Sequence, residues 1–333
     1  MATIKEIAKR SGFSPATVSR LLNNDSKLSV TPETKSKILK VATELGYFKS
    51  QGKEIRSVIP EVALLYRVNG KEHLEDEYFS FLRQRVEEIA QEEKINCTLF
   101  TDAQELIREA HLYQGFLGVG TGELTENLLK QLHQVLPAGV FIDINPAPYL
   151  FDSVQPNLSL TIQNAIDRLL THGYTFLGYI GAESFTLDKQ PQRDVREITF
   201  DEYCKNRRVP KTTIVANGIV SVENGYALAK ELVKKCGRDL PEALVVASDT
   251  LSVGVLQYFN EIGIKVPKDI AIISINNSEV AKYVSPPLTS YNIDQKALSK
   301  LAISILKMRI LNPKLPTLHL TVNTNLIIRK SFN

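Results

Sequence analysis

Hydrophobic positions in the first 48 residues recur every three or four residues, in groups separated by short polar segments. This spacing is typical of amphipathic helices with one buried face, so the pattern predicts three short helices that pack together. Such helices bury little surface, which is typical of a small module attached to a larger body. The apolar groups are Ile4, Ile7 and Ala8, then Val18, Leu21 and Leu22, and finally Ile38, Val41, Ala42 and Leu45.

Residues at the expected helix ends support this prediction. Thr3 followed by Glu6 is the pattern of a capping box, in which each side chain binds the backbone N–H of the other residue. Gly12 suits the left-handed conformation that ends a helix. Ser14 is suited to cap the second helix, and Pro15 to its first position, where no backbone hydrogen bond is lost. A tight turn is therefore predicted between the first two helices.

From residue 61 onward, short runs of β-branched and aromatic residues alternate with helical patterns. This alternation predicts parallel sheets that are covered by helices on both faces. We therefore expect a small all-α headpiece followed by an α/β body of two doubly wound parallel-sheet subdomains. The predicted strands are 61–66, 95–100, 115–120, 138–144, 176–181, 212–216, 243–248 and 269–275, and the predicted helices lie near 78–93, 103–112, 123–134, 158–172, 193–206, 222–236 and 250–262.

Composition limits the possible classes of protein. With 333 residues, of which 43% are hydrophobic and 23% charged, the chain has the composition of an ordinary soluble protein with two or three domains. No apolar run approaches the ~20 residues that span a membrane, and the N-terminus lacks the apolar core of a signal peptide. The three cysteines have no paired spacing, which predicts reduced thiols. We therefore expect a cytoplasmic protein without a disulfide, bound metal or cofactor.

Positive charge is concentrated at the N-terminus. Residues 1–60 contain 11 Lys and Arg against 5 Asp and Glu, a net charge of +6, whereas the whole chain carries +3. A basic helical module is typical of nucleic-acid binding, and the second helix has the small and polar residues of a recognition helix that enters the major groove. The alternative interpretation is a helical hairpin whose basic face is only solvated.

Double-stranded DNA is therefore the predicted partner. Arg20 is the best candidate for a base contact, because a guanidinium can bind both O6 and N7 of guanine. Ala16 is suited to contact a thymine methyl group, and Thr17, Ser19 and Asn23 are suited to contact phosphates. The full set of predicted DNA-binding residues is Thr3, Ser14, Pro15, Ala16, Thr17, Ser19, Arg20, Asn23, Lys27 and Ser29.

The string IKEIAKRSGFSPATVSRLLNN, followed by SVTPETKSKIL and ELGY, resembles the headpiece of the LacI/GalR family of bacterial transcription regulators. Weaker marks of this family follow in the body: FID at 141–143, HGY at 172–174, VREITFDEY at 195–203, ASD at 247–249, VPKDIAIISINN at 266–277 and SPPLTSYNID at 285–294. The resemblance implies a DNA-binding headpiece at 1–48, a hinge or linker at 49–60 and an effector-binding domain at 61–333 that resembles periplasmic binding proteins. It further implies an N-terminal subdomain of 61–156 plus 290–312 and a C-terminal subdomain of 157–289 plus 313–333.

The hinge departs from the family pattern. In the family this segment usually forms a short helix on DNA and inserts a leucine into the minor groove. The usual proline-asparagine start and alanine-leucine core are missing from KSQGKEIRSVIP, and Gly52 disfavours a helix. An unstructured tether is therefore the preferred prediction, and a hinge helix with Ile55 as the wedge is the alternative.

Polar residues at strand ends are the candidate effector contacts, because open parallel sheets bind ligands beyond the carboxyl ends of their strands, here in the cleft expected between two sheets. Carboxylate, amide and guanidinium groups form paired hydrogen bonds with vicinal hydroxyls, so a sugar is expected. In the family, the positions that match Asp143, Arg196, Ser248 and Asn276 contact sugar. The full predicted set, with two aromatic residues as a platform, is Tyr66, Phe79, Asp143, Arg196, Ser248, Asp249 and Asn276.

Each candidate also has a purely structural interpretation. Ser248 or Asp249 is suited to cap the helix that follows them. Arg196 can pair with a neighbouring acidic residue. Asp143 and Asn276 are suited to turns, and Phe79 is equally suited to a core or a dimer face.

The run VREITFDEYCKNR resembles galactoside-responsive members of the family, which implies galactose, lactose or a related galactoside as the effector. One helix-turn-helix reads half an operator, so a homodimer on a pseudopalindromic operator is expected. The hypothesis is negative coupling, in which sugar releases a repressor from DNA. The alternatives are a corepressor with the same architecture, or a sugar-binding protein without regulatory DNA binding.

An enzyme is not expected. The glycine-rich turn GVGTGE at 118–123 lacks the G-x-G-x-x-G spacing of a dinucleotide-binding loop. The five histidines are scattered and form neither a metal-binding spacing nor a catalytic triad.

Overall fold

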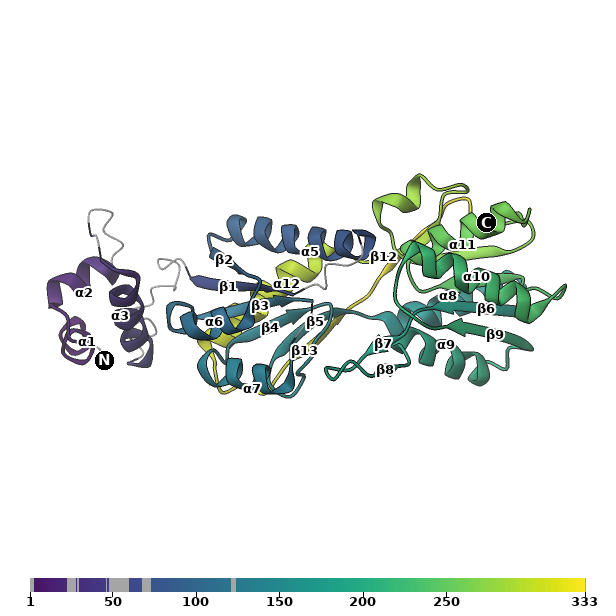
Figure 1. Cartoon of the computed structure of the whole chain (residues 1–333). Coiled ribbons are helices and arrows are strands. Elements are labelled where there is room, and N and C mark those ends of the chain that lie inside the picture. The colour runs from purple at the N-terminus through teal and green to yellow at the C-terminus, as the bar shows by residue number, and fades with distance from the viewer. Residues whose placement is uncertain are drawn as a thin grey trace. The chain divides into compact units, whose positions relative to one another are not determined.

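The structure is a computed structural model that describes residues 3–22, 28, 30–45, 47, 60–67, 73–120 and 124–332. The N-terminal module consists of α1 (Ile4–Ser11), α2 (Pro15–Leu22) and α3 (Pro32–Glu44), as labelled in Figure 1. These are the helices predicted from the apolar spacing. Residues 49–59 of the predicted hinge and residues 121–123 of the glycine-rich turn lie outside the described residues.

The predicted caps of α1 and α2 are present. Thr3 Oγ1 accepts a hydrogen bond from the Glu6 amide, and Glu6 Oε2 accepts one from the Thr3 amide, both at 3.3 Å. Gly12 has φ 80°, the left-handed conformation expected at the end of α1. Ser14 Oγ accepts from the Thr17 amide at 3.0 Å and so begins α2. The sequence therefore determines where each of these helices begins and ends.

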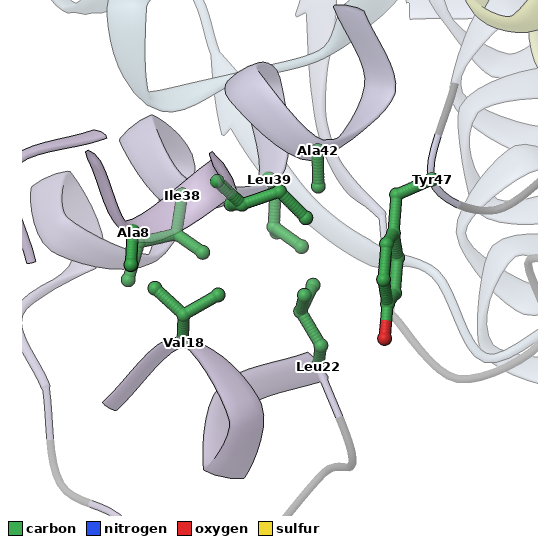
Figure 2. Packing of buried hydrophobic residues seen from close by; sticks show 8 residues of the cluster. Ala8, Val18, Leu22, Ile38, Leu39, Ala42 and Tyr47 are labelled. Atoms are coloured by element: carbon green, nitrogen blue, oxygen red, sulfur yellow. The ribbon is translucent and has the colours of Figure 1, made fainter. Parts of the chain in front are cut away.

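One side of each helix contributes to a single small core (Figure 2). Ile7, Val18 and Ile38 are completely buried there, each from a different helix. Two residues that the spacing did not single out, Leu39 and Tyr47, are also buried. The remaining members of the buried cluster are Ala8, Leu22 and Ala42, with Ile4, Phe13, Leu21, Val41 and Leu45 packed partly buried against it.

The body contains two six-stranded sheets. The first has the order β13-β5-β4-β3-β1-β2 and the second has the order β14-β12-β11-β10-β6-β9. Parallel pairing joins β2, β1, β3 and β4 in the first sheet and β9, β6, β10, β11 and β12 in the second, which confirms the predicted parallel α/β class. The strands predicted from the sequence are β1 (Glu61–Tyr66), β2 (Asn96–Phe100), β3 (Gly115–Val119), β4 (Gly139–Ile142), β6 (Phe176–Gly181), β9 (Lys211–Ala216), β10 (Ala243–Val246) and β11 (Ala271–Asn276).

Helices alternate with these strands along the chain, close to the predicted ranges. Two glycines bring α10 and α11 into direct backbone contact, since a Cβ on Gly254 would lie 1.9 Å from the Val222 carbonyl oxygen and one on Gly225 would lie 2.1 Å from the Leu251 carbonyl oxygen. In the described part of the chain, no helix is both long enough and apolar enough to cross a membrane. The helices are α5 (His73–Glu92), α6 (Ala103–Glu109), η1 (Ala110–Leu112), α7 (Glu126–Val135), α8 (Leu158–Thr171), α9 (Val195–Asn206), α10 (Val222–Cys236), α11 (Asp249–Glu261), η2 (Glu279–Lys282) and α12 (Gln295–Leu311).

Several short strands were not predicted, and one of them places three residues outside their expected subdomain. β12 (Thr289–Asn292) pairs with β11 in the second sheet, so 290–292 do not belong to the N-terminal subdomain. β13 (His319–Val322) is an edge strand of the first sheet. These segments are short, and their partners lie far away in the sequence, so local pattern does not reveal which sheet they join. The other unpredicted strands are β5 (Asp152–Pro156), β14 (Asn325–Ile327) and the hairpin of β7 (Ser184–Phe185) and β8 (Pro191–Gln192).

The chain divides into two compact units, each assembled from separate segments. We call them the first and the second unit. The first comprises Met1–Arg67, Arg85–Ser153 and Lys300–Leu318, and the second comprises Val68–Gln84, Val154–Ser299 and His319–Asn333.

The last described residues belong to the interior of the second unit. Phe332 is fully buried, and Ser331 is fully buried beside it. Ser331 Oγ donates to the Ile272 carbonyl at 2.7 Å and accepts from the Thr289 amide at 2.8 Å. The Ser331 hydroxyl therefore links β11 to β12 through these two hydrogen bonds.

Candidate functional site

Helix α2 has one buried face and one exposed face of small and polar residues. Val18 and Leu22 are buried, whereas Pro15, Ala16 and Arg20 are exposed. Because packing of the buried pair fixes the rotation of the helix, the exposed residues all face away from the core. A face of small residues with one guanidinium can approach base edges closely.

The start of α2 is held by local hydrogen bonds. Ser14 and Thr17 place their hydroxyl oxygens 2.8 Å apart, in addition to the cap between the Thr17 amide and Ser14 Oγ. Thr3 is exposed, but its hydroxyl is part of the capping box of α1. Ser19 is half-buried, and both Ser19 and Arg20 make interactions within the protein. The predicted DNA contacts Asn23, Lys27 and Ser29 lie outside the described residues.

The neighbouring helices α1 and α3 also carry exposed cations. Their charge suits the phosphates on either side of a groove, which position a recognition helix without reading sequence. The exposed cations are Lys5, Lys9 and Arg10 of α1 and Lys37 and Lys40 of α3.

In the second unit, Arg196 lies on α9, and its side chain reaches the carboxyl end of β10. Its guanidinium donates from Nε to Asp194 Oδ1 at 2.6 Å and from Nη2 to Asp194 Oδ2 at 3.0 Å, and Nη1 donates to the carbonyl of Ala247 at 2.9 Å. Burial would raise the pKa of Asp194, but the guanidinium outweighs it and holds that pKa below its usual value. The ion pair therefore holds the Arg196 guanidinium in one orientation beside the strand end. This agrees with the structural interpretation of Arg196, a pair with a neighbouring acidic residue.

Asp249 is completely buried, which corrects its prediction as an effector contact. Its Oδ2 accepts from the amide and the hydroxyl of Ser278 at 2.7 and 3.0 Å, and its Oδ1 accepts from Ser290 Oγ at 2.7 Å. Burial raises the pKa of Asp249, although hydrogen bonds from the serines around it oppose this shift. The carboxyl group therefore links α11 to the ends of β11 and β12 and is not presented to a ligand. Ser248 is also buried and accepts from the Leu251 amide at 3.2 Å as the N-cap of α11.

The end of β11 has an uncommon backbone conformation. Asn276 has φ 106° and Asn277 has φ 53°, both in the region that favours glycine. Asn277 is anchored, because its Nδ2 donates to Asn292 Oδ1 at 2.9 Å and its Oδ1 accepts from Arg329 Nη2 at 2.6 Å. By contrast, the Asn276 carboxamide has no hydrogen-bond partner among the described residues. Strain of this kind is concentrated at functional sites, which supports Asn276 as a ligand contact.

The three remaining candidates differ in exposure. Tyr66 ends β1 and Asp143 follows β4, and both are half-buried. Asp143 has φ 73°, a left-handed conformation that turns the chain after the strand. Phe79 is only 8% exposed and packs edge-to-face on Tyr78, with ring centroids 5.2 Å apart. Phe79 is therefore a core side chain, and its prediction as an aromatic platform is corrected.

Residues that sequence reasoning missed hold this site together from a distance. Ser290 Oγ accepts a hydrogen bond from the Asn277 amide at 3.0 Å, and the same hydroxyl donates one to Asp249. Arg329 comes from the end of the described chain, and Nη1 donates to the Leu288 carbonyl at 2.7 Å. No local signal marks either residue, because a serine in a strand and an arginine in a terminal segment are both common.

Comparison with known proteins agrees with this organisation. Residues 3–50 match the family of bacterial regulatory proteins of the lacI type, and residues 166–332 match the periplasmic binding protein-like domain. The HTH-type transcriptional regulator LacR of Lactobacillus helveticus is 50% identical over 333 residues, which cover 100% of this chain and 98% of LacR.

Two solved structures show the same fold. The Lac repressor dimer bound to operator and the anti-inducer ONPF has a TM-score of 0.64 at 16% identity and covers 100% of this chain and 99% of its own. The complex of the transcriptional regulator CelR with cellobiose has a TM-score of 0.66 at 20% identity and covers 99% of this chain and 100% of its own.

The helix-turn-helix and the two parallel-sheet α/β subdomains that follow it in the chain define a DNA-binding transcriptional regulator and not an enzyme. The chain belongs to the LacI family of bacterial regulatory proteins.

Proposed function

We propose that this regulator represses a sugar-utilisation operon and leaves its operator when a small sugar binds beyond the carboxyl ends of the strands of the second unit. The observation that carries this proposal is Arg196, an ionised guanidinium held by Asp194 and the Ala247 carbonyl at the end of β10. A planar donor fixed at the edge of an open parallel sheet is suited to bind a neighbouring pair of hydroxyls.

We propose that α2 reads the major groove. Arg20 contacts base edges, and Pro15, Ala16, Thr17 and Ser19 follow the groove wall, with Thr3, Ser14, Asn23, Lys27 and Ser29 beside them. The exposed small face of α2 and the cations of α1 and α3 support this assignment. The Lac repressor with a similar fold is bound to operator, which agrees with it.

The proposed effector is galactose, lactose or a related galactoside. We assign Arg196 and Asn276 of the second unit as its principal contacts, with the hydroxyl of Ser248 as a further contact. Amide and guanidinium groups provide the donors and acceptors that hydroxyl groups require. The structurally similar regulator CelR is complexed with a sugar, cellobiose, which supports this ligand class.

The proposed functional unit is a cytoplasmic homodimer. One recognition helix reads only half of a two-fold operator, so two copies are required for a complete site. We assign 1–48 as the headpiece, 49–60 as the hinge or linker and 61–333 as the effector-binding domain. The dimeric Lac repressor with a similar fold supports the two-fold arrangement.

Operator binding tests both parts of this proposal. DNA fragments that the full-length protein selects would define the operator, and fluorescence anisotropy would measure its Kd with and without galactose and lactose. We expect sugar to weaken operator binding by about tenfold or more, in the usual range of allosteric coupling. Strengthened binding would show a corepressor instead, and no change with any sugar would contradict the effector assignment.

A matched pair of variants tests the site. Arg196→Lys keeps the positive charge but loses the planar fork, so we expect normal operator binding and a weakened sugar response. Arg193→Lys is the control. Arg193 is exposed, lies just before the same helix, and pairs at 2.6 Å with Glu197 on the first turn of that helix. An unchanged sugar response in Arg196→Lys would contradict the assigned role of Arg196.

A further inference from the structure

A cavity lies in the second unit beside α8. Its volume is about 460 Å³. One wall consists of side chains from the last turns of α8 and the other of side chains from β12 and β14. The lining residues are Asn164, Asp167, Arg168, Thr171, His172, Tyr291, Thr324 and Leu326. None of these residues belongs to the strand-end site.

Tyr291 contributes a hydroxyl group to the lining of this cavity. The residue is 4% exposed, and burial raises the pKa of its hydroxyl to about 12. Among the described residues this hydroxyl has no hydrogen-bond partner. Although the residue is buried as a whole, its hydroxyl oxygen is not one of the buried atoms without a partner, so it is open to the cavity. A ligand in the cavity can therefore form a hydrogen bond with it.

Arg168 gives the cavity its charge. Its guanidinium forms no ion pair or hydrogen bond with any described residue. The adjacent Asp167 does not neutralise it, because Asp167 Oδ1 lies 3.0 Å from Arg207 Nε and Oδ2 accepts from the Tyr203 hydroxyl at 2.8 Å. One uncompensated cation therefore remains in the cavity.

The other polar groups suit hydroxyls. His172 Nδ1 lies 2.8 Å from the Arg168 carbonyl oxygen, so Nδ1 donates and Nε2 is the acceptor in the neutral ring. The carboxamide of Asn164 has no partner among the described residues. The cavity lies beside the C-terminal turns of α8, where the helix dipole disfavours anions. The affinity for an anion must therefore come from the Arg168 side chain and not from the helix backbone.

One lining residue connects the cavity to the path of the chain between the sheets. Thr324 lies between β13 of the first sheet and β14 of the second. Its hydroxyl oxygen is 2.8 Å from that of Thr161 on α8, and Asn157 Nδ2 donates to Asn323 Oδ1 at 3.1 Å. A ligand in the cavity therefore touches the link that joins the two sheets.

We infer that this cavity is a second effector site, which takes a small hydroxylated organic anion, with Arg168 bound to the carboxylate or phosphate group and Tyr291 to a hydroxyl. Because the ligand touches the link at Thr324, its binding changes operator affinity. The site does not depend on the sugar contacts proposed above.

Calorimetric titration of the full-length protein tests the site. The probes are gluconate, which carries a carboxylate, ribose 5-phosphate, which carries a phosphate, and neutral galactose as the uncharged comparison. We expect one of the two anions to bind, and Arg168→Gln to weaken that binding by about tenfold or more while thermal unfolding remains cooperative. Tyr291→Phe removes only the hydroxyl, and we expect a smaller loss, of about threefold to tenfold.

Two control variants locate the binding to this cavity. Arg238→Gln removes an exposed cation of the same unit outside the cavity and is expected to bind the anion as the wild type does. Arg196→Lys is expected to bind it normally as well, so failure of the strand-end site leaves this result unaffected. The proposed site would be overturned if neither anion bound at concentrations up to about 10 mM. It would also be overturned if Arg168→Gln bound the anion as tightly as the wild type. Unchanged operator affinity at saturating anion would overturn its regulatory role.

Discussion

Arg309 near the end of α12 and Asp152 at the start of β5 form a buried ion pair with two parallel hydrogen bonds. Arg309 Nε donates to Asp152 Oδ2 at 2.8 Å, and Nη2 donates to Oδ1 at 2.6 Å. The side chains are only 10% and 1% exposed. Nη2 also donates to the Pro316 carbonyl at 2.7 Å, and Asp152 Oδ1 accepts from the Leu318 amide at 2.7 Å. The pair therefore holds three separate stretches of the first unit together.

Arg309→Gln is expected to lower the free energy of unfolding by about 3–5 kcal/mol, because it leaves the Asp152 carboxylate buried without a counter-charge. Urea denaturation measures this loss. Lys307→Gln is the control on the same helix, since Lys307 pairs with Glu93 at 2.7 Å in an exposed position. That control should cost at most about 1 kcal/mol. Similar losses for both variants would contradict the importance of burial.

Asn276→Gly is expected to stabilise the protein and weaken its response to sugar. Glycine adopts φ 106° without strain, so the free energy of unfolding should rise by about 1 kcal/mol. The same change removes the carboxamide that is proposed to bind the effector. Thermal unfolding and sugar titration of the operator complex measure the two effects.

Asn276→Ala separates the two effects of that change. Alanine also lacks the carboxamide but retains the strained φ, so we expect the same loss of sugar response without any gain in stability. A normal sugar response in both variants would show that Asn276 acts only in the turn.

Asp249→Asn is expected to change how stability depends on pH. Burial raises the pKa of Asp249 in the folded protein above its value in the unfolded chain. Its contribution to stability is therefore complete below the usual Asp range and declines as pH rises through the folded pKa. Relative to the Asn variant, the wild type should lose stability as pH rises from about 4, where an unperturbed Asp titrates. Denaturation curves over a pH series measure this difference, and parallel pH profiles would contradict the shift.

Arg20→Ala is expected to weaken operator binding by about tenfold to a hundredfold and to relax the preference for one base pair. Because Arg20 is exposed, the melting temperature should change little. Lys9→Gln is a useful comparison, since an exposed lysine on α1 is expected to bind phosphate. Its loss should weaken binding to all sequences equally and lower the salt dependence by about one ion. Equal loss on all sequences in Arg20→Ala would contradict a base contact.

The ends of the headpiece helices were predictable because their causes are local. Thr3 and Glu6 cap the first turn of α1, and Gly12 ends its last turn, so each contact is local. The spacing of Ile7 and the other apolar residues reveals the buried face. Tyr47 was missed because a single aromatic residue after the last periodic position has no spacing to indicate its burial. The central strands of both sheets were also predictable, since their two buried faces require continuous apolar runs.

The candidate effector site was predicted only in part, because its geometry depends on contacts between distant segments. Strand ends identified Arg196 and Asn276, but the same rule selected Asp249, which Ser278 and Ser290 satisfy completely. Sequence position does not show whether a carboxylate at a strand end faces a ligand or the interior. Likewise, β13 and β14 are short edge strands whose alternation is compatible with either sheet.

The burial of Ser331 and Phe332 has a consequence for the order of events during synthesis. The Ser331 hydroxyl bonds both β11 and β12, so the ribosome must release residue 331 before these two strands can be fastened to each other through it.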